Sequence, residues 1–394
     1  MINRLRVIGP MVVLVLAALA PAQTFTTLTN FNVDSGSFPL AGVIQDQFGN
    51  LYGTTYGGCG IWGCGEVYKV DTAGTAGTET VLLAFCRHTA CSDGNYPEAP
   101  LVRNKAGGFY GTTYAGGTGC PYYGCGVVFK VDTAGNKTLY RFTGKSDGCW
   151  PYQGLVVSEP GTVFGTTAYC GSSNHGTIFK VDNAGKFSIL HSFTGRPSDG
   201  AHPTNGHLTM DETGNLYGVT AGGGAFGEGV LYTLSEKRRL TVLHSFGKGS
   251  DGCNPFGSVV QDKAGNFYGT TGYCGSHNYG TIWKVSKNGK ETILHSFAGG
   301  ASDGCYPNAG VARDSKGNLY GVTDSCGANG YGTLYELSPQ GRLTLLHSFT
   351  GLDGSNPNGE VLRTSEGRLF GTTFEGGTGI CGSYGCGTVW SYVP

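Results

Sequence analysis

The sequence predicts an all-β fold, a seven-bladed β-propeller with four antiparallel strands per blade. Three observations lead to it: an excess of glycine, a short motif that recurs seven times, and chain ends that complete each other. Glycine supplies 71 of the 394 residues, about 18% against a usual share of roughly 7%. Charged residues make up only 13% and methionine occurs three times, which disfavours long amphipathic helices. Because 39% of the residues are hydrophobic and the glycines follow no Gly-X-Y period, collagen-like and wholly disordered chains are excluded.

The main repeat is an aromatic residue, a glycine, a threonine or valine, and a threonine. Successive copies lie 50 to 58 residues apart, and the variation falls in glycine-rich stretches that must be loops. A second motif of glycine, any residue, an aliphatic residue and an aromatic residue follows each copy. Both motifs therefore mark one unit per blade. The glycines of the first motif are Gly53, Gly111, Gly165, Gly218, Gly269, Gly321 and Gly371, and the aromatic residues of the second are Tyr68, Phe129, Phe179, Tyr232, Trp283, Tyr335 and Trp390.

Each unit contains four segments with the alternation and turn residues of short strands. In the fifth unit these segments are 258–261, 267–271, 281–285 and 291–297. Four antiparallel strands in about 53 residues are typical of a propeller blade. The glycine of the second strand is expected to let the large third-strand aromatic side chain of the next blade lie against its backbone.

The two ends of the chain predict that the ring closes on itself. Residues 26–31 match a fourth strand, and residues 388–392 match a third strand that has no fourth strand after it. The first strand should therefore complete the last blade. A closed ring leaves only short, protected sheet edges, whereas a linear stack would leave two bare ones.

The chain resembles the Gloeo/Verruco (GloVer) tandem-repeat family, a family of secreted and surface β-propellers. The resemblance rests on Asn-Leu-Tyr-Gly-Val-Thr at 318–323, Gly-Thr-Ile-Trp-Lys-Val at 280–285, and Leu-His-Ser-Phe at 294–297 followed by Ser-Asp-Gly at 302–304. It covers the whole mature chain. It implies the propeller fold and a location outside the cytosol, and it implies no particular activity.

Residues 1–22 have the pattern of a secretory signal peptide. Arg4 and Arg6 precede an apolar run at 12–20, and Ala-Pro-Ala at 20–22 forms a small-residue cleavage site. The alternative, a retained membrane anchor, is disfavoured because the run is shorter than the ~20 residues that a bilayer span needs. We expect one domain, residues 23–394, in a secreted or periplasmic protein with no membrane span.

The charge of the mature chain argues against nucleic acid as a partner. Without the two arginines of the signal peptide, 24 basic and 27 acidic residues remain, a net charge of −3. No face or segment concentrates positive charge beyond the triplet at 237–239. We expect a monomer that uses no cofactor and no metal, with a glycan or a surface protein as the possible partner.

Fourteen cysteines in a secreted chain predict seven disulfides. Three blades carry cysteine at the same two loop positions, and the other four blades have it at neither, so these positions pair. The remaining eight cysteines form Cys-x4-Cys pairs, for which zinc binding is disfavoured by the secreted context. The predicted pairs are Cys149 with Cys170, Cys253 with Cys274, Cys305 with Cys326, Cys59 with Cys64, Cys86 with Cys91, Cys120 with Cys125, and Cys381 with Cys386.

The cysteine-rich loops share one rim of the propeller, and aromatic residues gather in them. Flat rings among uncharged polar loops suit sugar rings, which stack on aromatic faces. The alternative is that the rings cover disulfides and fill gaps between loops, and the sequence leaves both open. The candidate ligand-binding residues are Phe38, Tyr96, Trp150, His202 and Tyr306, each just before a proline, together with Tyr169 and Tyr273.

Acid/base chemistry has three weak candidates, His202, His207 and Glu360, because they depart from the residues usual at their repeat positions. They belong to blades 4 and 7, so no cluster is expected, and tolerance of substitution at a loop end is the simpler account. Aspartates of a recurring Asp-Gly pair could bind calcium, but capping of their own turns is favoured. Histidines 191, 244, 295 and 347 occupy a position that accepts Leu and Tyr elsewhere, which indicates packing.

The function predicted from these observations is a ligand-binding module for extracellular polysaccharide or surface glycan, more in keeping with the sequence than an enzyme. Two alternatives stay open. One is a polysaccharide lyase or lactonase-type hydrolase at the channel mouth, and the other is a structural or protein-binding surface scaffold.

Overall fold

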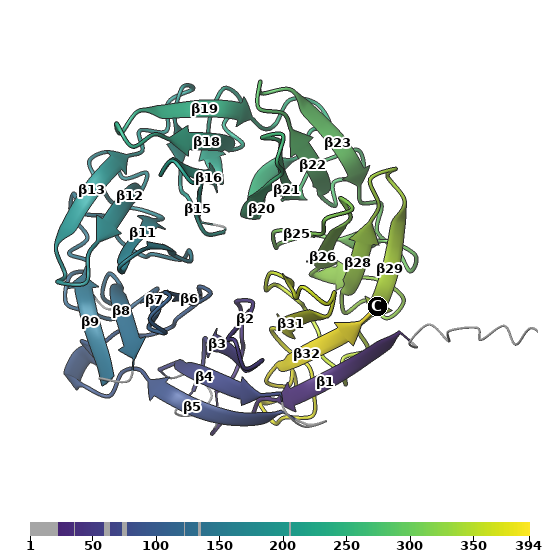
Figure 1. Cartoon of the computed structure of the whole chain (residues 1–394), viewed down its shortest axis with the longest axis horizontal. Helices are drawn as coiled ribbons and strands as arrows, with labels where there is room; N and C mark the ends of the chain where they lie inside the picture. Colours follow the sequence, from purple (N-terminus) through teal and green to yellow (C-terminus); the bar gives the residue numbers. More distant parts are fainter. Residues whose placement is uncertain are drawn as a thin grey trace, which may run out of the picture.

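Seven four-stranded antiparallel sheets stand around one axis and form a closed ring (Figure 1). The structure is a computed structural model that describes residues 23–34, 36–58, 64–72, 77–121, 123–132, 135–204 and 206–394. The expected signal peptide at 1–22 lies outside the described residues. The predicted fold class, an all-β propeller of seven blades, is confirmed.

The strands of the first four blades follow one another along the chain, innermost strand first. Blade 1 contains β2 (Ile44–Gln45), β3 (Leu51–Thr55), β4 (Glu66–Asp71) and β5 (Thr78–Ala84). Blade 2 contains β6 (Val102–Arg103), β7 (Phe109–Thr113), β8 (Val127–Asp132) and β9 (Gly135–Arg141). Blade 3 contains β10 (Val156–Ser158), β11 (Thr162–Thr167), β12 (Thr177–Val181) and β13 (Phe187–Ser192), and blade 4 contains β15 (Thr209–Met210), β16 (Leu216–Thr220), β18 (Val230–Leu234) and β19 (Leu240–Ser245).

The remaining blades repeat this order until the chain ends. Blade 5 contains β20 (Cys253–Gln261), β21 (Phe267–Tyr273), β22 (Thr281–Val285) and β23 (Glu291–Ser296). Blade 6 contains β25 (Ala312–Arg313), β26 (Leu319–Thr323), β28 (Thr333–Leu337) and β29 (Leu343–Ser348), and blade 7 contains β30 (Leu362–Arg363), β31 (Leu369–Thr373), β32 (Thr388–Val393) and β1 (Thr24–Asn30). Two-stranded sheets β14–β17 (Gly200–Ala201, Gly222–Gly223) and β24–β27 (Gly304–Cys305, Ser325–Cys326) and the 3-10 turn η1 (Thr89–Cys91) belong to rim loops.

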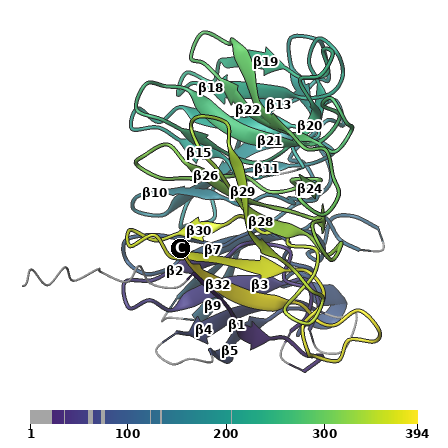
Figure 2. The same cartoon turned by 90° about the vertical axis from the view of Figure 1, so that its right-hand side faces the viewer.

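The innermost strands surround a central channel. In Figure 1, β2, β6, β15, β20 and β25 lie nearest the axis, and β5, β9, β13, β19, β23, β29 and β1 form the outer margin. β24 lies at one rim, on the right in Figure 2, and the C-terminus lies on the opposite side. No helix among the described residues is long and apolar enough to cross a membrane.

The first strand closes the ring, as predicted. β1 pairs antiparallel with β32, with Thr24 opposite Val393 and Asn30 opposite Thr388. The next residue, Phe31, donates its N–H to the Gly387 carbonyl oxygen at 3.1 Å. Both edges of β32 are thereby paired, since β31 covers its other side.

The motif glycine of the second strand serves its own blade, which corrects the expectation that it receives the next blade's aromatic residue. Gly269 lies opposite Trp283 in the β21–β22 register, and a Cβ on Gly269 would lie 2.5 Å from the Trp283 ring. Gly53 and Tyr68 of blade 1 have the same relation at 2.4 Å. A side chain at this position is excluded because the ring of the neighbouring strand covers the backbone.

A phenylalanine at the end of each fourth strand connects successive blades. Each packs against the third-strand aromatic ring of the next blade, as in the Phe246–Trp283 pair with ring centroids 5.2 Å apart. Burial of each such side chain stabilises the fold by about 1.5 to 3 kcal/mol. The core is therefore a ring of aromatic pairs: Phe31–Tyr68, Phe85–Phe129, Phe142–Phe179, Phe193–Tyr232, Phe246–Trp283, Phe297–Tyr335 and Phe349–Trp390.

Six of the seven predicted disulfides are confirmed. The bridges join Cys86–Cys91, Cys120–Cys125, Cys149–Cys170, Cys253–Cys274, Cys305–Cys326 and Cys381–Cys386. Cys59 lies outside the described residues, so its predicted bridge to Cys64 stays a prediction.

Candidate functional site

A strained turn leads into the innermost strand of every blade. The residue before the proline has a positive φ in all seven blades, for example 57° at Trp150 and 59° at Tyr306. Its N–H donates to a carbonyl oxygen of the preceding blade's rim, as from Tyr306 to Tyr279 at 2.9 Å. The strained backbone conformation therefore accompanies a hydrogen bond between neighbouring blades. The seven residues are Phe38, Tyr96, Trp150, His202, Asn254, Tyr306 and Asn356.

The rings predicted to bind ligand pack against one another around the rim. Tyr96 stacks on Tyr56 at 4.5 Å, Tyr169 contacts His202 at 4.6 Å, and Tyr273 contacts Tyr306 at 5.6 Å. Phe38 is only 6% exposed, and Trp150 lies 5.5 Å from Tyr169. Among the seven candidates, Tyr273 alone is classed as exposed, at 46%. These contacts agree with the alternative that the rings fill gaps between the rim loops.

A cavity opens at the mouth of the central channel, where the innermost strands begin. It has a volume of about 220 Å³ and all seven blades line it. The residue directly after each proline contributes to the cavity wall. This residue is different in each of blades 1 to 5 and is asparagine in blades 6 and 7. These residues are Leu40, Glu98, Tyr152, Thr204, Phe256, Asn308 and Asn358.

Glu98 is the carboxyl group of this wall whose protonation is most altered. Burial raises its pKa to about 7, from an ordinary value of 4.5. The Glu98 charge in turn adds to the effect of burial on Tyr56, whose pKa is raised to about 12. A carboxyl group that titrates near neutral pH in a cavity can exchange protons with a ligand.

Two buried amide atoms of the cavity residues lack a hydrogen-bond partner among the residues that the structure describes. Gln153 is 4% exposed; its Oε1 accepts from Thr166 Oγ1 at 3.1 Å, but its Nε2 has no partner. Asn308 Oδ1 is likewise buried and unpaired. Leaving such groups unpaired costs about 1 to 3 kcal/mol each, so a polar ligand that paired with them would be favoured.

His207 and Glu360 form a cluster, which corrects the expectation that they lie apart. His207 Nδ1 lies 3.6 Å from Glu360 Oε2, across the channel mouth from blade 4 to blade 7. Ser258 of blade 5 joins them: its Oγ lies 2.6 Å from His207 Nδ1, and its N–H donates to Glu360 Oε1 at 2.6 Å. Blades 4 and 7 are not neighbours in the ring, so their side chains meet only because both reach into the channel mouth.

The geometry of the cluster differs from a serine-protease triad. There the serine and the acid hold opposite nitrogens of the histidine ring, whereas Ser258 Oγ and Glu360 Oε2 both face His207 Nδ1. Ser258 Oγ also accepts the backbone N–H of His207 at 3.1 Å.

Gly310 explains how Glu360 reaches Ser258 past the intervening blade 6. A Cβ on Gly310 would lie 2.9 Å from Glu360 Oε1 and 2.8 Å from the Ser258 nitrogen. The absence of a side chain at this position therefore leaves room for the carboxylate.

His202 stays at the rim, separate from the cavity. Its Nε2 lies 3.3 Å from His175 Nδ1, and its Nδ1 lies 3.2 Å from the Ala168 carbonyl oxygen. Burial lowers the pKa of His202, and the nearby His175 acts in the same direction. Of the three candidates for acid/base chemistry, the structure brings two together and leaves this one apart.

The recurring aspartates cap their own turns, as expected. Asp147 accepts from the Thr143 N–H at 2.8 Å and from the Lys145 N–H at 3.2 Å. The fourth-strand histidines also contact these aspartates, which the packing interpretation missed: His295 Nε2 lies 3.2 Å from Asp303. Each of these histidines is followed by an Asp-Gly pair in the same repeat unit, and this pattern could have predicted the contact.

Glu98 is the main cavity residue that the sequence reasoning missed. It occupies the position directly after the proline, whereas the predicted departures from the repeat, His207 and Glu360, lie further along the innermost segment. Variation at that position, between flanking residues that repeat closely, is the pattern that would have revealed the cavity wall.

Comparison with known proteins identifies a repeat family and a shared fold. The sequence pattern of the Gloeobacter/Verrucomicrobia repeat matches residues 15–208, 121–315 and 204–394. No curated protein matches the chain. A virginiamycin B lyase from Staphylococcus aureus is 11% identical, with a TM-score of 0.58 over 94% of this chain and 99% of that one. A streptogramin B lyase is also 11% identical, with a TM-score of 0.59 over 94% and 97% of the two chains.

A third similar structure is the extracellular domain of a protein described as a hybrid two-component system from B. thetaiotaomicron. It is 13% identical, with a TM-score of 0.55 over 94% of this chain and 41% of that one. At these identities the likeness shows the fold alone. The six disulfides are typical of an oxidising, extracellular environment.

Proposed function

The chain belongs to the Gloeobacter/Verrucomicrobia repeat family, and we propose that it is a secreted or periplasmic ligand-binding propeller whose channel-mouth cavity binds a sugar unit of an extracellular polysaccharide or surface glycan. One observation carries the proposal. The backbone of the strained turns is the same in all seven blades, but the residue directly after each proline, whose side chain lines the cavity, differs between most blades. Different polar and aromatic side chains around one concave surface are typical of a binding site.

The chemistry of the wall suits a polyhydroxylated ligand. Glu98, Asn308 and Asn358 provide carboxyl and amide groups that pair with hydroxyls, and Tyr152 and Phe256 provide ring faces. The cavity of about 220 Å³ is smaller than the roughly 300 to 1,000 Å³ of sites for drug-sized ligands. A single sugar unit is therefore the size of ligand proposed.

Binding of purified oligosaccharides to the mature chain, residues 23–394, tests this proposal. Isothermal titration calorimetry after a glycan-array screen would measure the affinity of the wild type, Asn308→Ala and Tyr273→Ala. We expect the cavity variant to lose at least tenfold in affinity and the rim variant to bind as the wild type does. Loss confined to Tyr273→Ala would move the site to the rim, and an empty array would reject glycan binding.

Acid/base catalysis at the same cavity is the second candidate, a polysaccharide lyase or lactonase-type hydrolase. It is favoured by Glu98, with its pKa of about 7, and by the contacts of His207 with Ser258 and Glu360. Glu98 could take or give a proton near neutral pH. Cleavage of an array-positive polymer, lost in His207→Ala but with binding retained, would support catalysis, and binding without turnover in the wild type would reject it.

A further inference from the structure

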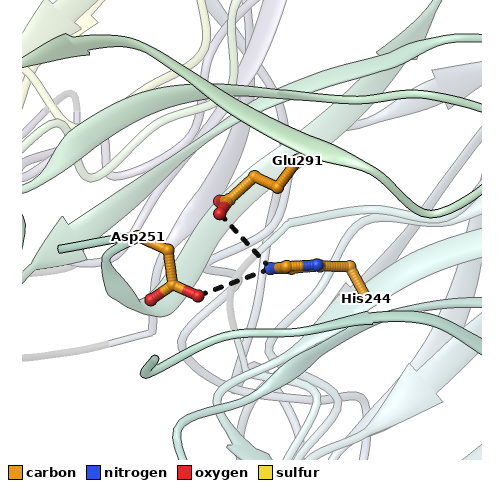
Figure 3. A group of neighbouring side chains, drawn as sticks. All are labelled: His244, Asp251 and Glu291. Carbon is orange, nitrogen blue, oxygen red and sulfur yellow. Dashed lines mark ion pairs between the residues drawn. The ribbon is translucent and has the colours of Figure 1, made fainter. Parts of the chain in front are cut away.

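Three potential metal ligands converge between blades 4 and 5, away from the channel mouth (Figure 3). His244 belongs to β19, Asp251 to the loop that precedes β20, and Glu291 to the start of β23. His244 Nε2 lies 3.6 Å from both Asp251 Oδ2 and Glu291 Oε2. The three ligand atoms all lie within 4.8 Å of one another.

The other blades with the same histidine show a different contact. His191, His295 and His347 lie 3.1, 3.2 and 2.9 Å from their loop aspartates, within hydrogen-bonding distance. The corresponding distance from His244 to Asp251 is 3.6 Å, too long for a hydrogen bond. His244 Nε2 and Asp251 Oδ2 therefore lie further apart than the matching atoms of the other three blades, and Glu291 faces both of them.

Glu291 lies opposite Val285, two residues after the aromatic residue of the third strand. The corresponding residue is apolar or aromatic in blades 3, 4, 6 and 7, Glu79 in blade 1 and Asn136 in blade 2. Blade 7, which precedes Glu79 in the ring, has Thr29 at the position of His244. Phe25 at this position stacks on His347 with ring centroids 3.7 Å apart. In blade 5 a carboxylate replaces that apolar contact. The residues at this position in blades 3, 4, 6 and 7 are Phe187, Leu240, Leu343 and Phe25.

The polar atoms of this group are buried with few hydrogen bonds. The Gly247 N–H donates to Asp251 Oδ1 at 3.0 Å, but His244 Nε2 and Glu291 Oε1 have no hydrogen-bond partner within the described part of the chain. Lys248 lines a second cavity, which adjoins the three residues, but among the described residues no ion pair joins it to either carboxylate. A bound cation would supply the positive charge that two buried carboxylates require.

We propose that His244, Asp251 and Glu291 bind a divalent transition-metal ion of the Zn²⁺ type and so connect blades 4 and 5. Ligands of tetrahedral Zn²⁺ lie about 3.3 Å apart, given bonds of about 2.0 Å. The observed 3.6 Å separations are close to that value. One imidazole with two carboxylates suits such an ion, whereas Ca²⁺ takes six to eight oxygen ligands.

The surroundings supply the outer contacts of a metal site. The Gly289 backbone interacts with the His244 ring. A backbone carbonyl at the second ring nitrogen is the usual way to orient a metal-binding histidine. The adjoining cavity, which Phe226 and Lys248 also line, leaves space for a water molecule at a fourth position.

Calorimetric titration with ZnCl2 tests the proposal on the untagged mature chain after treatment with a chelator and its removal. We expect one equivalent of Zn²⁺ to bind to the wild type and the affinity to fall at least a hundredfold in Glu291→Leu. This variant copies blades 4 and 6, so its fold should be intact. The matched gain variant Leu343→Glu places a carboxylate beside His295 and Asp303, and we expect it to bind a second equivalent.

A second loss variant guards against misfolding of the first. His244→Tyr copies Tyr140, whose hydroxyl donates to Asp147 at 2.9 Å in blade 2, and it should also lose Zn²⁺ binding. Equal Zn²⁺ binding by the wild type and both loss variants would overturn the proposal, because other histidines would then hold the metal. Absence of binding to the wild type would overturn it as well.

Discussion

Glu98 is a single residue whose ionisation should affect both ligand binding and folding. Its pKa in the folded chain is about 7, raised by burial from 4.5. Between these two values the folded chain holds a proton that the unfolded chain has lost. The stability that this proton provides is complete below about pH 4.5 and is lost as the pH rises through 7.

Glu98→Gln should remove this pH dependence. Urea denaturation of the wild type and the variant at pH 5 and pH 8 measures the change, which is at most about 3 kcal/mol. We expect the wild type to lose more stability than the variant between the two pH values. Glu212→Gln, an exposed site on the turn between β15 and β16, is the control and should follow the wild type. Parallel pH profiles of all three would show that Glu98 is ionised normally.

Gly310→Ala should displace Glu360 without removing any functional group. The new Cβ would lie 2.7 Å from the Ser258 carbonyl oxygen and 2.9 Å from Glu360 Oε1, so the backbone or the carboxylate must move. We expect a stability loss of about 1 to 3 kcal/mol and loss of any ligand affinity or activity that depends on the His207 cluster. Gly222→Ala, where the nearest atoms lie 3.6 Å away, is the control in the same assays. Unchanged function in Gly310→Ala would remove Glu360 from the site.

At the scale of single strands, the sequence predicted most of the structure because a strand's pattern is local. The four segments of the fifth unit match β20 to β23 within a few residues, except that β20 begins earlier, at Cys253. The partner of the motif glycine was predicted in the wrong blade. A repeat gives every blade the same residues, so it cannot distinguish a contact within a blade from the same contact between blades.

The candidate site was less predictable than the strands. His207, Ser258 and Glu360 come from three blades, and their contact depends on how closely the innermost strands approach the axis. The rim rings show the same limit, because Tyr169 and Tyr273 both precede Cys-Gly-Ser, but Tyr169 is half-buried and Tyr273 is 46% exposed. The exposure of a rim ring depends on the packing of the neighbouring loops. The alternation of apolar and polar residues that identifies strands carries no information about that packing.

Phe297→Ala should weaken the contact between blades 5 and 6. Phe297 is fully buried, and its ring centroid lies 5.5 Å from that of Tyr335 in the next blade. Truncation removes a large apolar side chain and leaves a cavity, so we expect a loss of about 3 to 5 kcal/mol in the free energy of unfolding. Phe48→Ala, at a position 80% exposed, should change it by less than about 0.5 kcal/mol. Equal effects in denaturant titrations would contradict the role of the aromatic pairs.

At the scale of the whole molecule, stability depends on closing the ring. Each blade buries its fourth-strand phenylalanine against the next blade, so an open ring would leave one such face exposed. β1 prevents this: Leu28 and Phe31 are buried, and β32 is paired on both edges. The N-terminal strand therefore contributes to the last blade and, through Phe31 and Tyr68, to the first.

Moving β1 to the other end of the chain separates its role in closure from its position in the sequence. Thr24 lies opposite Val393, so an Asn-Gly turn inserted after Pro394 can join the ends as a hairpin. A permutant that starts at Gly36 and ends with residues 23–35 should keep its melting temperature within a few degrees. Deletion of 23–31 removes the same strand without replacing it, and we expect loss of the cooperative calorimetric transition, because β32 gains a bare edge and Tyr68 loses its partner. A deletion variant that melts like the wild type would show that the ring is stable unclosed.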